Sequence, residues 1–232
     1  VLDKNTYSSW LKTKKDYSGY KVDKNAMENW LLKFMYKYNT QYGWHKFKTH
    51  DGRTKKIYGG PYGCRISKDK EMASVKKMLK EGTTETREPY WREKAKVYDG
   101  VNGDIGDTYV EVDMGAQTVY YYKKGKVVLD TPFVSGRMTK DRFTPPGVYF
   151  LTYKQKDRIL RGRPNASGQP SYQSHVNYWM PFNGGIGLHD ASWRSSFGGK
   201  IYIYSGSHGC INLPGKKAAK IYEMINKETP IV

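Results

Sequence analysis

Apolar residues recur at every fourth position between Asp23 and Asn39, which predicts an amphipathic helix of roughly four turns. Asp23 or Asn25 can cap its first turn, because a short polar side chain there accepts hydrogen bonds from free amide groups. The positions expected to face a core are Ala26, Met27, Trp30, Leu31, Phe34 and Tyr38. Residues 1–22 mix apolar and polar side chains, and we expect a short strand or two there.

Turn residues divide the next stretch into a hairpin and a second helix. Asp51-Gly52 lies between two strand-like runs, a pattern typical of a β-hairpin. Ser67 opens a helical pattern that ends near Lys80, and Gly82 supplies its stop. Residues 83–100 favour a strand or an extended segment. The Gly- and Asp-rich stretch 100–107 is the best candidate for a linker.

Beyond the linker the pattern alternates with a period of two, which indicates strands. Strands are expected at 109–114, 117–122, 126–134, 147–153 and 176–182, with a long functional loop at 155–175 and a last helix at about 214–226. The sequence therefore predicts two domains. An α+β domain at 1–104 is followed by a mainly β, sandwich-like domain at 105–232.

Candidate chemistry is concentrated between Gly187 and Asn212. This stretch holds Cys210 and two of the five histidines, His189 and His208, among many Gly and Ser residues. The apolar run at 201–204 suggests a strand that leads to a nucleophile on a loop. Because a thiol attacks as its thiolate, it needs a base, and histidine titrates near neutral pH.

His189 is the expected base, since it can return from a separate strand to face the thiol. His208 is only two residues from Cys210, so we assign it an orienting or electrostatic role. The N–H groups of Gly209 and Cys210 are the expected oxyanion donors, and the N-terminus of the last helix would favour the thiolate. Residue types alone leave three alternatives: a zinc site, a disulfide between Cys210 and Cys64, and a buried, inert cysteine.

Three segments in the second half resemble the L,D-transpeptidases with a YkuD-type catalytic domain. SHGCIN at 207–212, with an upstream histidine in GLHD, is similar to the family's signature. The stretch 110–137 resembles its opening hairpin, and TPPGVYFL at 144–151 resembles its TPxG turn and strand. Residues 47–67 and 86–91 resemble, less specifically, the domain associated with peptidoglycan binding that precedes the catalytic domain in some Gram-positive members.

The resemblance assigns roles to single residues. Cys210 matches the acylated nucleophile, His189 the base and His208 the second histidine of the motif. Ser207, Gly209 and Asn212 match the other motif positions, and Trp193 matches an aromatic residue beside the substrate cleft. Asp190 stands where many members have Gly, so it is a candidate for the group that orients His189. Independently, Tyr178, Trp179 and Met180 are expected to divide between an acyl pocket and the core.

By this resemblance the chain is an acyltransferase of peptidoglycan stem peptides. Cys210 would release D-Ala from a tetrapeptide stem, form a thioester and pass the acyl group to an amine in a 3→3 cross-link. Carbapenems would acylate the same thiol. The same site could instead act as an L,D-carboxypeptidase, and a non-catalytic basic wall-binding module is the alternative without chemistry. We expect no cofactor and no metal.

Composition adds the partners and the location. A formal charge of +18 favours anionic partners such as wall polymers, whereas no motif of a nucleic-acid-binding fold is present. The sequence contains no run of eighteen apolar residues, which is about the length that a helix needs to span a bilayer. The chain starts at Val1, which suggests a longer protein with an upstream membrane anchor or export signal. We therefore expect it on the extracellular face of a bacterial envelope, in the cell wall.

Overall fold

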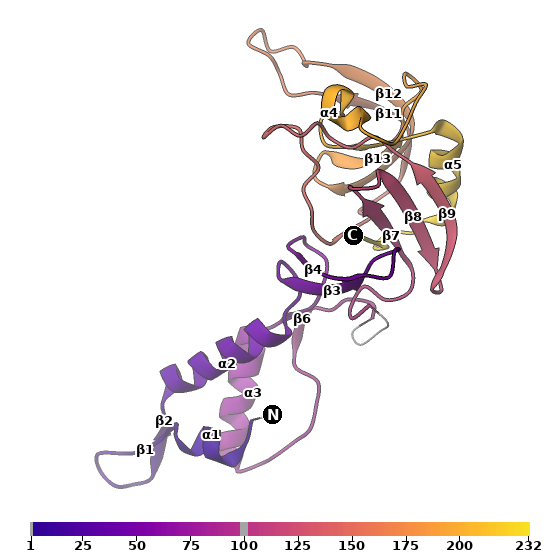
Figure 1. Cartoon of the computed structure of the whole chain (residues 1–232). Coiled ribbons are helices and arrows are strands. Elements are labelled where there is room, and N and C mark those ends of the chain that lie inside the picture. Colours follow the sequence, from indigo (N-terminus) through magenta and orange to yellow (C-terminus); the bar gives the residue numbers. More distant parts are fainter. Residues whose placement is uncertain (1, 98–101) are drawn as a thin grey trace. The chain divides into compact units, whose positions relative to one another are not determined.

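A computed structural model describes residues 2–97 and 102–232 (Figure 1). Contacts divide the chain into two compact units. The first unit consists of Val1–Gln41 and Gly63–Ala95, and the second of Tyr42–Tyr62 and Lys96–Val232. Helices dominate the first unit and strands the second, so the predicted fold class is confirmed. No helix among the described residues is both long and apolar enough to cross a membrane.

The first unit is built around two helices, α2 (Lys24–Tyr38) and α3 (Lys68–Glu81). The Asp23 carboxylate accepts hydrogen bonds from the amides of Asn25 and Ala26, as the cap prediction requires. Gly82 ends α3 in the left-handed conformation, with φ +64°. The helices bury a small apolar cluster that contains Trp10, Met27, Leu31, Met72 and Val75.

Short elements complete this unit. They are α1 (Lys4–Ser8), the antiparallel pair β1 (Leu11–Thr13) and β2 (Tyr20–Val22), and the antiparallel pair β5 (Arg65–Ile66) and β6 (Trp91–Glu93). The two short strands expected before residue 23 are thus confirmed. The helix α1 was not predicted, because five residues are too few to display a helical period.

The predicted hairpin at Asp51-Gly52 forms from β3 (Trp44–Lys48) and β4 (Thr54–Tyr58), but it packs with the second unit. Phe47 of β3 is buried edge-on against Tyr109, with ring centroids 5.3 Å apart. His45 Nδ1 lies 2.9 Å from an Asp104 carboxylate oxygen, and both side chains are buried. The contact of Phe47 with Tyr109 joins residues on the two sides of the predicted domain boundary at 104/105, which stays a prediction.

The predicted linker at 100–107 is only partly described. Residues 100 and 101 lie outside the described residues. Asn102, Asp104 and Ile105 are buried, and Tyr62 donates a hydrogen bond to the Asp104 carbonyl at 2.8 Å. The linker prediction is therefore wrong for 102–105, because side chains of 42–62 cover this stretch.

Two sheets form most of the second unit. One is five-stranded, in the order β10-β15-β7-β8-β9, and the other is four-stranded, in the order β11-β12-β13-β14. The strands of the first sheet are β7 (Tyr109–Asp113), β8 (Thr118–Lys123), β9 (Lys126–Pro132), β10 (Tyr149–Phe150) and β15 (Pro230–Ile231). Those of the second are β11 (Gln155–Arg161), β12 (Gln173–Asn183), β13 (Ile186–Asp190) and β14 (Ile211–Leu213).

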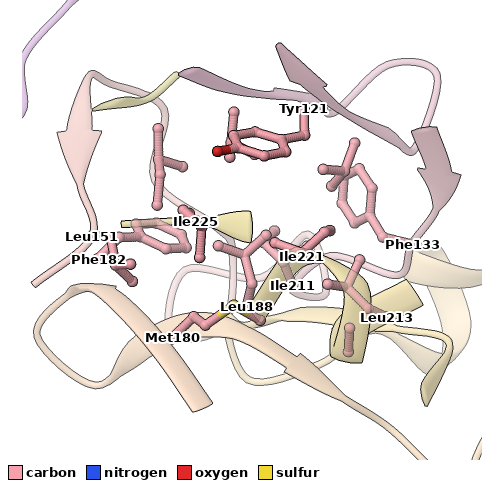
Figure 2. Packing of buried hydrophobic residues seen from close by; sticks show 14 of the residues in the cluster. Tyr121, Phe133, Leu151, Met180, Phe182, Leu188, Ile211, Leu213, Ile221 and Ile225 are labelled. Atoms are coloured by element: carbon pink, nitrogen blue, oxygen red, sulfur yellow. The ribbon is translucent and has the colours of Figure 1, made fainter. Parts of the chain in front are cut away.

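The core of this unit lies between the sheets and the last helix, α5 (Gly215–Met224). Figure 2 shows Tyr121 and Phe133 on one side of the cluster and Met180 and Leu188 on the other. Ile221 of α5 packs into the same cluster. Complete burial of such side chains is worth roughly 1.5–3 kcal/mol each, so this cluster holds the two sheets together.

Two expectations for this half are wrong. The stretch 155–175 is not one continuous loop, because β11 and the start of β12 pair as an antiparallel hairpin and only 162–172 connects them. The run 201–204 is not a strand, because Ile201–Ser205 forms the short helix α4. Cys210 consequently stands directly before a strand, β14, and does not follow one.

Candidate active site

Strand alternation brings Cys210 and His189 to the same face of the four-stranded sheet. The strands β13 and β14 run parallel, with Leu188 opposite Ile211 and His189 opposite Asn212. Leu188 and Ile211 point into the core cluster. Since neighbouring residues of a strand point to opposite faces, His189 and Cys210 both lie on the other face.

Cys210 is buried, with 8% of its surface exposed, and packs against Val176 and Trp179. Its Sγ–H donates to the Gly185 carbonyl, with Sγ 3.6 Å from the oxygen. Burial raises the pKa of the thiol to about 11, and an amide hydrogen bond from Gly187 only partly offsets this. Cys210 therefore rests as a neutral thiol at physiological pH.

His189 is buried and held in one tautomer. Its Nδ1 lies 2.8 Å from the main-chain oxygen of Asp190, and because a carbonyl only accepts, Nδ1 carries the proton. Nε2 is then the free acceptor. Burial lowers the pKa of the imidazole below 6.5, so the ring is neutral and can take a proton. The imidazole ring also contacts the rings of Trp179 and Trp193, and the distance between ring centroids is 5.9 Å in both cases.

The Asp190 carboxylate does not orient His189. It accepts hydrogen bonds from the Asn177 amide nitrogen at 2.9 Å and the Tyr178 N–H at 2.8 Å. These bonds tie β13 to β12. The orienting group at this position is thus the Asp190 backbone oxygen, which any residue type would supply.

The loop before Cys210 is fixed by side chains that bond to its backbone. Ser207 Oγ donates to the Cys210 carbonyl at 2.6 Å and accepts the Gly209 N–H at 3.0 Å. Thr144 Oγ1 donates to the Gly209 carbonyl at 2.8 Å and accepts the Gly136 N–H at 3.0 Å. Ser207 therefore supports the loop from a buried position. Because the Gly209 N–H already donates to Ser207 Oγ, the Cys210 N–H is the remaining one of the two expected oxyanion donors.

Glycine is required where this loop meets the 136–144 segment. Gly209 has φ +119°, a conformation that other residues rarely adopt. A Cβ on Gly136 would lie 2.0 Å from the Arg142 carbonyl oxygen and 2.9 Å from the Gly209 Cα. The close approach of two backbones thus sets the position of the cysteine loop.

His208 is exposed and lies flat on Tyr172, with ring centroids 4.6 Å apart and planes 29° apart. Desolvation, and then the charge of Arg142, lower the pKa of His208. Burial and the nearby Cys210 raise the pKa of Tyr172. Tyr172 stands immediately before β12, and sequence reasoning missed it because nothing in its neighbourhood distinguishes it from twenty other tyrosines.

The remaining predicted residues separate by face. Trp179 packs with Cys210, whereas Met180 lies in the core and Tyr178 packs against that core and Tyr222. The structure thus places Met180 and Tyr178 away from the thiol. Trp193 is 51% exposed beside His189. Asn212 is buried, and its Oδ1 has no hydrogen-bond partner among the described residues.

The last helix, one hydrogen bond and the two cysteines complete the description of the site. The helix α5 begins at Gly215, beyond the three residues of β14, and its expected effect on a Cys210 thiolate stays a prediction. Trp179 donates from Nε1 to the Tyr153 hydroxyl at 3.3 Å, a contact that sequence reasoning also missed. No disulfide joins Cys64 to Cys210, and the described residues contain no His, Cys, Asp and Glu cluster suited to a metal ion.

Comparisons with known proteins agree on one family. The YkuD model, described as the L,D-transpeptidase catalytic domain, matches residues 107–232. The crystal structure of a cysteine-to-serine mutant of the Enterococcus faecium L,D-transpeptidase is 34% identical, with 97% of this chain and 87% of that chain covered and a TM-score of 0.79. The structure of the Ldtfm-avibactam carbamoyl enzyme is 35% identical, with 98% and 86% covered and a TM-score of 0.82. No curated protein matches the chain.

Proposed function

Because this chain belongs to the L,D-transpeptidase family, we propose that Cys210 transfers acyl groups between the peptide stems of peptidoglycan, with His189 as its base. The family supplies the reaction class, an acyl transfer. The observation that carries the assignment to residues is the common face of Cys210 and His189 on the parallel β13–β14 pair.

In the proposed first step, His189 Nε2 takes the Cys210 proton as Sγ attacks the carbonyl carbon of the third stem residue. The Nδ1 contact with the Asp190 carbonyl keeps Nε2 available as acceptor. Negative charge develops on the substrate oxygen, where the Cys210 N–H is the candidate donor. Collapse of this intermediate breaks the peptide bond, and the imidazolium returns its proton to the leaving D-Ala amine. A thioester remains.

In the proposed second step, the side-chain amine of a neighbouring stem attacks the thioester. His189 removes a proton from the attacking nitrogen and returns it to the departing sulfur, which regenerates the thiol. The product is a 3→3 cross-link. Trp193 is exposed beside His189 and is suited to cover either stem. The same thioester would release a tripeptide if water attacked in place of the amine.

Acylation by a carbapenem tests the nucleophile. Intact mass should rise by a single adduct in the wild-type chain and stay unchanged in Cys210→Ala, and His189→Ala should slow the adduct roughly 10²–10⁴-fold. Cys64→Ala is the matched control and should acylate like wild type, since Cys64 is the other cysteine of the chain. A folded wild-type chain that gains no adduct would instead favour a non-catalytic, basic wall-binding module.

A tetrapeptide substrate tests the fate of the thioester. Incubation with a disaccharide tetrapeptide should give cross-linked dimer and free D-Ala, both absent in Cys210→Ala. Tripeptide without dimer would assign the chain as an L,D-carboxypeptidase. Substrates with diaminopimelate and with lysine at the third position, compared at equal concentration, would identify the acceptor amine.

The same proposal covers location and the remaining sequence. Peptidoglycan stems lie outside the cytoplasmic membrane, so we place the chain in the cell wall, with an upstream membrane anchor and with anionic wall polymers as partners of its +18 charge. We also propose that 105–232 is the catalytic domain and that 1–104 binds peptidoglycan or acts as a spacer. A sedimentation assay of the full chain with purified sacculi tests whether it binds peptidoglycan.

A further inference from the structure

A cavity lies in the second unit. It has a volume of about 230 Å³ and is lined by the β3–β4 hairpin, by β7 and by the 144–147 turn. Apolar side chains make most of its wall, among them Phe47, Ile57, Tyr149 and Phe182. None of Cys210, His189, His208 and Trp193 contributes to it. The proposed acyl transfer therefore does not account for this cavity.

A carboxyl group without a counter-ion stands in this apolar wall. Glu111 of β7 is 4% exposed. Its Oε1 accepts the His50 N–H at 2.9 Å, but its Oε2 has no hydrogen-bond partner among the described residues. Buried polar atoms are nearly always paired, because loss of water without a replacement bond is unfavourable. Burial, and then the charges of Asp113 and Asp51, raise the pKa of Glu111 to about 7, so above this pH Oε2 is an ionised, open acceptor beside an empty volume.

The charges around Glu111 favour a positively charged occupant. Asp113 also lines the cavity, and Asp51 stands on the adjacent hairpin turn. Arg53 is committed to an ion pair with Asp51. Lys55 is the other cation of the wall, and no ion pair joins it to Glu111 among the described residues. A donor that reaches Oε2 would therefore meet net negative charge.

We propose that this cavity binds a small primary ammonium with an apolar body, its nitrogen against Glu111 Oε2 and its carbon chain along Phe47 and Phe182. An alkylammonium matches both features of the wall, since the chain covers apolar surface while the head group donates up to three hydrogen bonds. The volume admits a group of about the size of one amino-acid side chain. The proposal is independent of the chemistry proposed for Cys210.

Three probes of equal length separate charge from shape: n-pentylamine, n-pentanol and pentanoate. Titration of the full chain, followed through the His50 and Val112 amide signals in NMR, should show saturable binding of pentylamine at least tenfold tighter than of pentanol. Pentanoate should bind more weakly still. Equal affinities for all three, or tighter binding of pentanoate, would overturn the ammonium assignment.

Glu111→Gln removes the charge with little change of shape and should abolish the preference for pentylamine over pentanol. Asp130→Asn, an exposed carboxylate of β9 outside the cavity, is the matched control and should keep that preference. Retention of the preference in Glu111→Gln would contradict the proposal. If that variant does not fold, Ile57→Phe fills the cavity while Glu111 remains. It should weaken pentylamine at least tenfold, and unchanged affinity would overturn the proposal.

Discussion

At the scale of single residues, the candidate pair is neutral before it reacts. Burial raises the pKa of Cys210 to about 11 and lowers that of His189 below 6.5. A thiolate and an imidazolium would both be charges in an apolar environment, which the structure does little to compensate. In the proposed mechanism we therefore expect the proton to move during attack on the substrate and not before it.

This protonation state predicts the pH dependence of alkylation. The rate of Cys210 modification by iodoacetamide should rise about tenfold per pH unit from pH 7 to 10 and level only near pH 11, because only the thiolate reacts. Mass spectrometry of the Cys64→Ala chain measures it directly. A plateau already at pH 8 would mean that a thiolate and imidazolium pair exists in the resting state.

Thr144 is expected to matter although it is not a catalytic residue. Thr144→Val keeps the shape but removes the hydroxyl that joins the Gly209 carbonyl to the Gly136 N–H. Loss of these buried bonds should cost roughly 1–3 kcal/mol of the free energy of unfolding and slow acylation of Cys210. Carbapenem acylation rates and urea unfolding measure the two effects. Thr118→Val, on β8, serves as the control and should leave acylation unchanged.

At the scale of elements, local signals explain which predictions succeeded. The helix α2 combines a capping residue with four turns of apolar spacing, so the sequence contains its start, its face and its end. The run at 201–204 is too short to display a period, and its β-branched and aromatic residues favour a strand. It forms α4, none of whose residues is buried. The surrounding fold thus overrode the strand propensity of these four residues.

The cap of α2 makes a measurable prediction. Asp23→Ala should lower the free energy of unfolding of the first unit by about 1 kcal/mol, because the amides of Asn25 and Ala26 lose their acceptor. Chemical denaturation followed by circular dichroism measures the change. Asp16→Ala is the matched control, since Asp16 bonds only to Ser18 in an exposed turn. An equal loss in both variants would argue against a capping role.

The candidate site was predictable in its residue types but not in its geometry. Cys210 and His189 were found because their chemistry is rare in this chain. Their common face depends on the parallel register of β13 and β14, which joins residues about twenty positions apart. The contact of Tyr172 with His208 could not be predicted for the same reason. It joins residues 36 positions apart and follows from the hairpin of β11 and β12.

At the scale of the whole molecule, a segment's position along the chain does not decide which unit it packs in. The hairpin at 44–58 falls in the predicted N-terminal domain, but its contacts belong to the second unit. Composition and turn signals mark where a chain bends, and they do not reveal which core a hairpin joins. That choice rests on side chains such as Phe47, which finds Tyr109 more than sixty residues later.

This packing predicts which unit a hairpin mutation weakens. Phe47→Ala should cost roughly 3–5 kcal/mol in the second unit, since it empties a buried aromatic position against Tyr109. Met27→Ala should weaken the first unit by roughly 2–5 kcal/mol. Hydrogen exchange resolved by residue distinguishes the two. A Phe47→Ala effect confined to the first unit would contradict the division described above.

The neutral, covered thiol also has a consequence for durability. Cysteines attack peroxides and disulfides as thiolates, so a protonated Cys210 should oxidise slowly in an oxidising environment. The chain's second cysteine offers no ready partner, because Cys64 is buried and accepts a hydrogen bond from the Ala95 amide. In the proposed mechanism, the burial that delays proton transfer until attack would thus also preserve Cys210 between encounters with substrate.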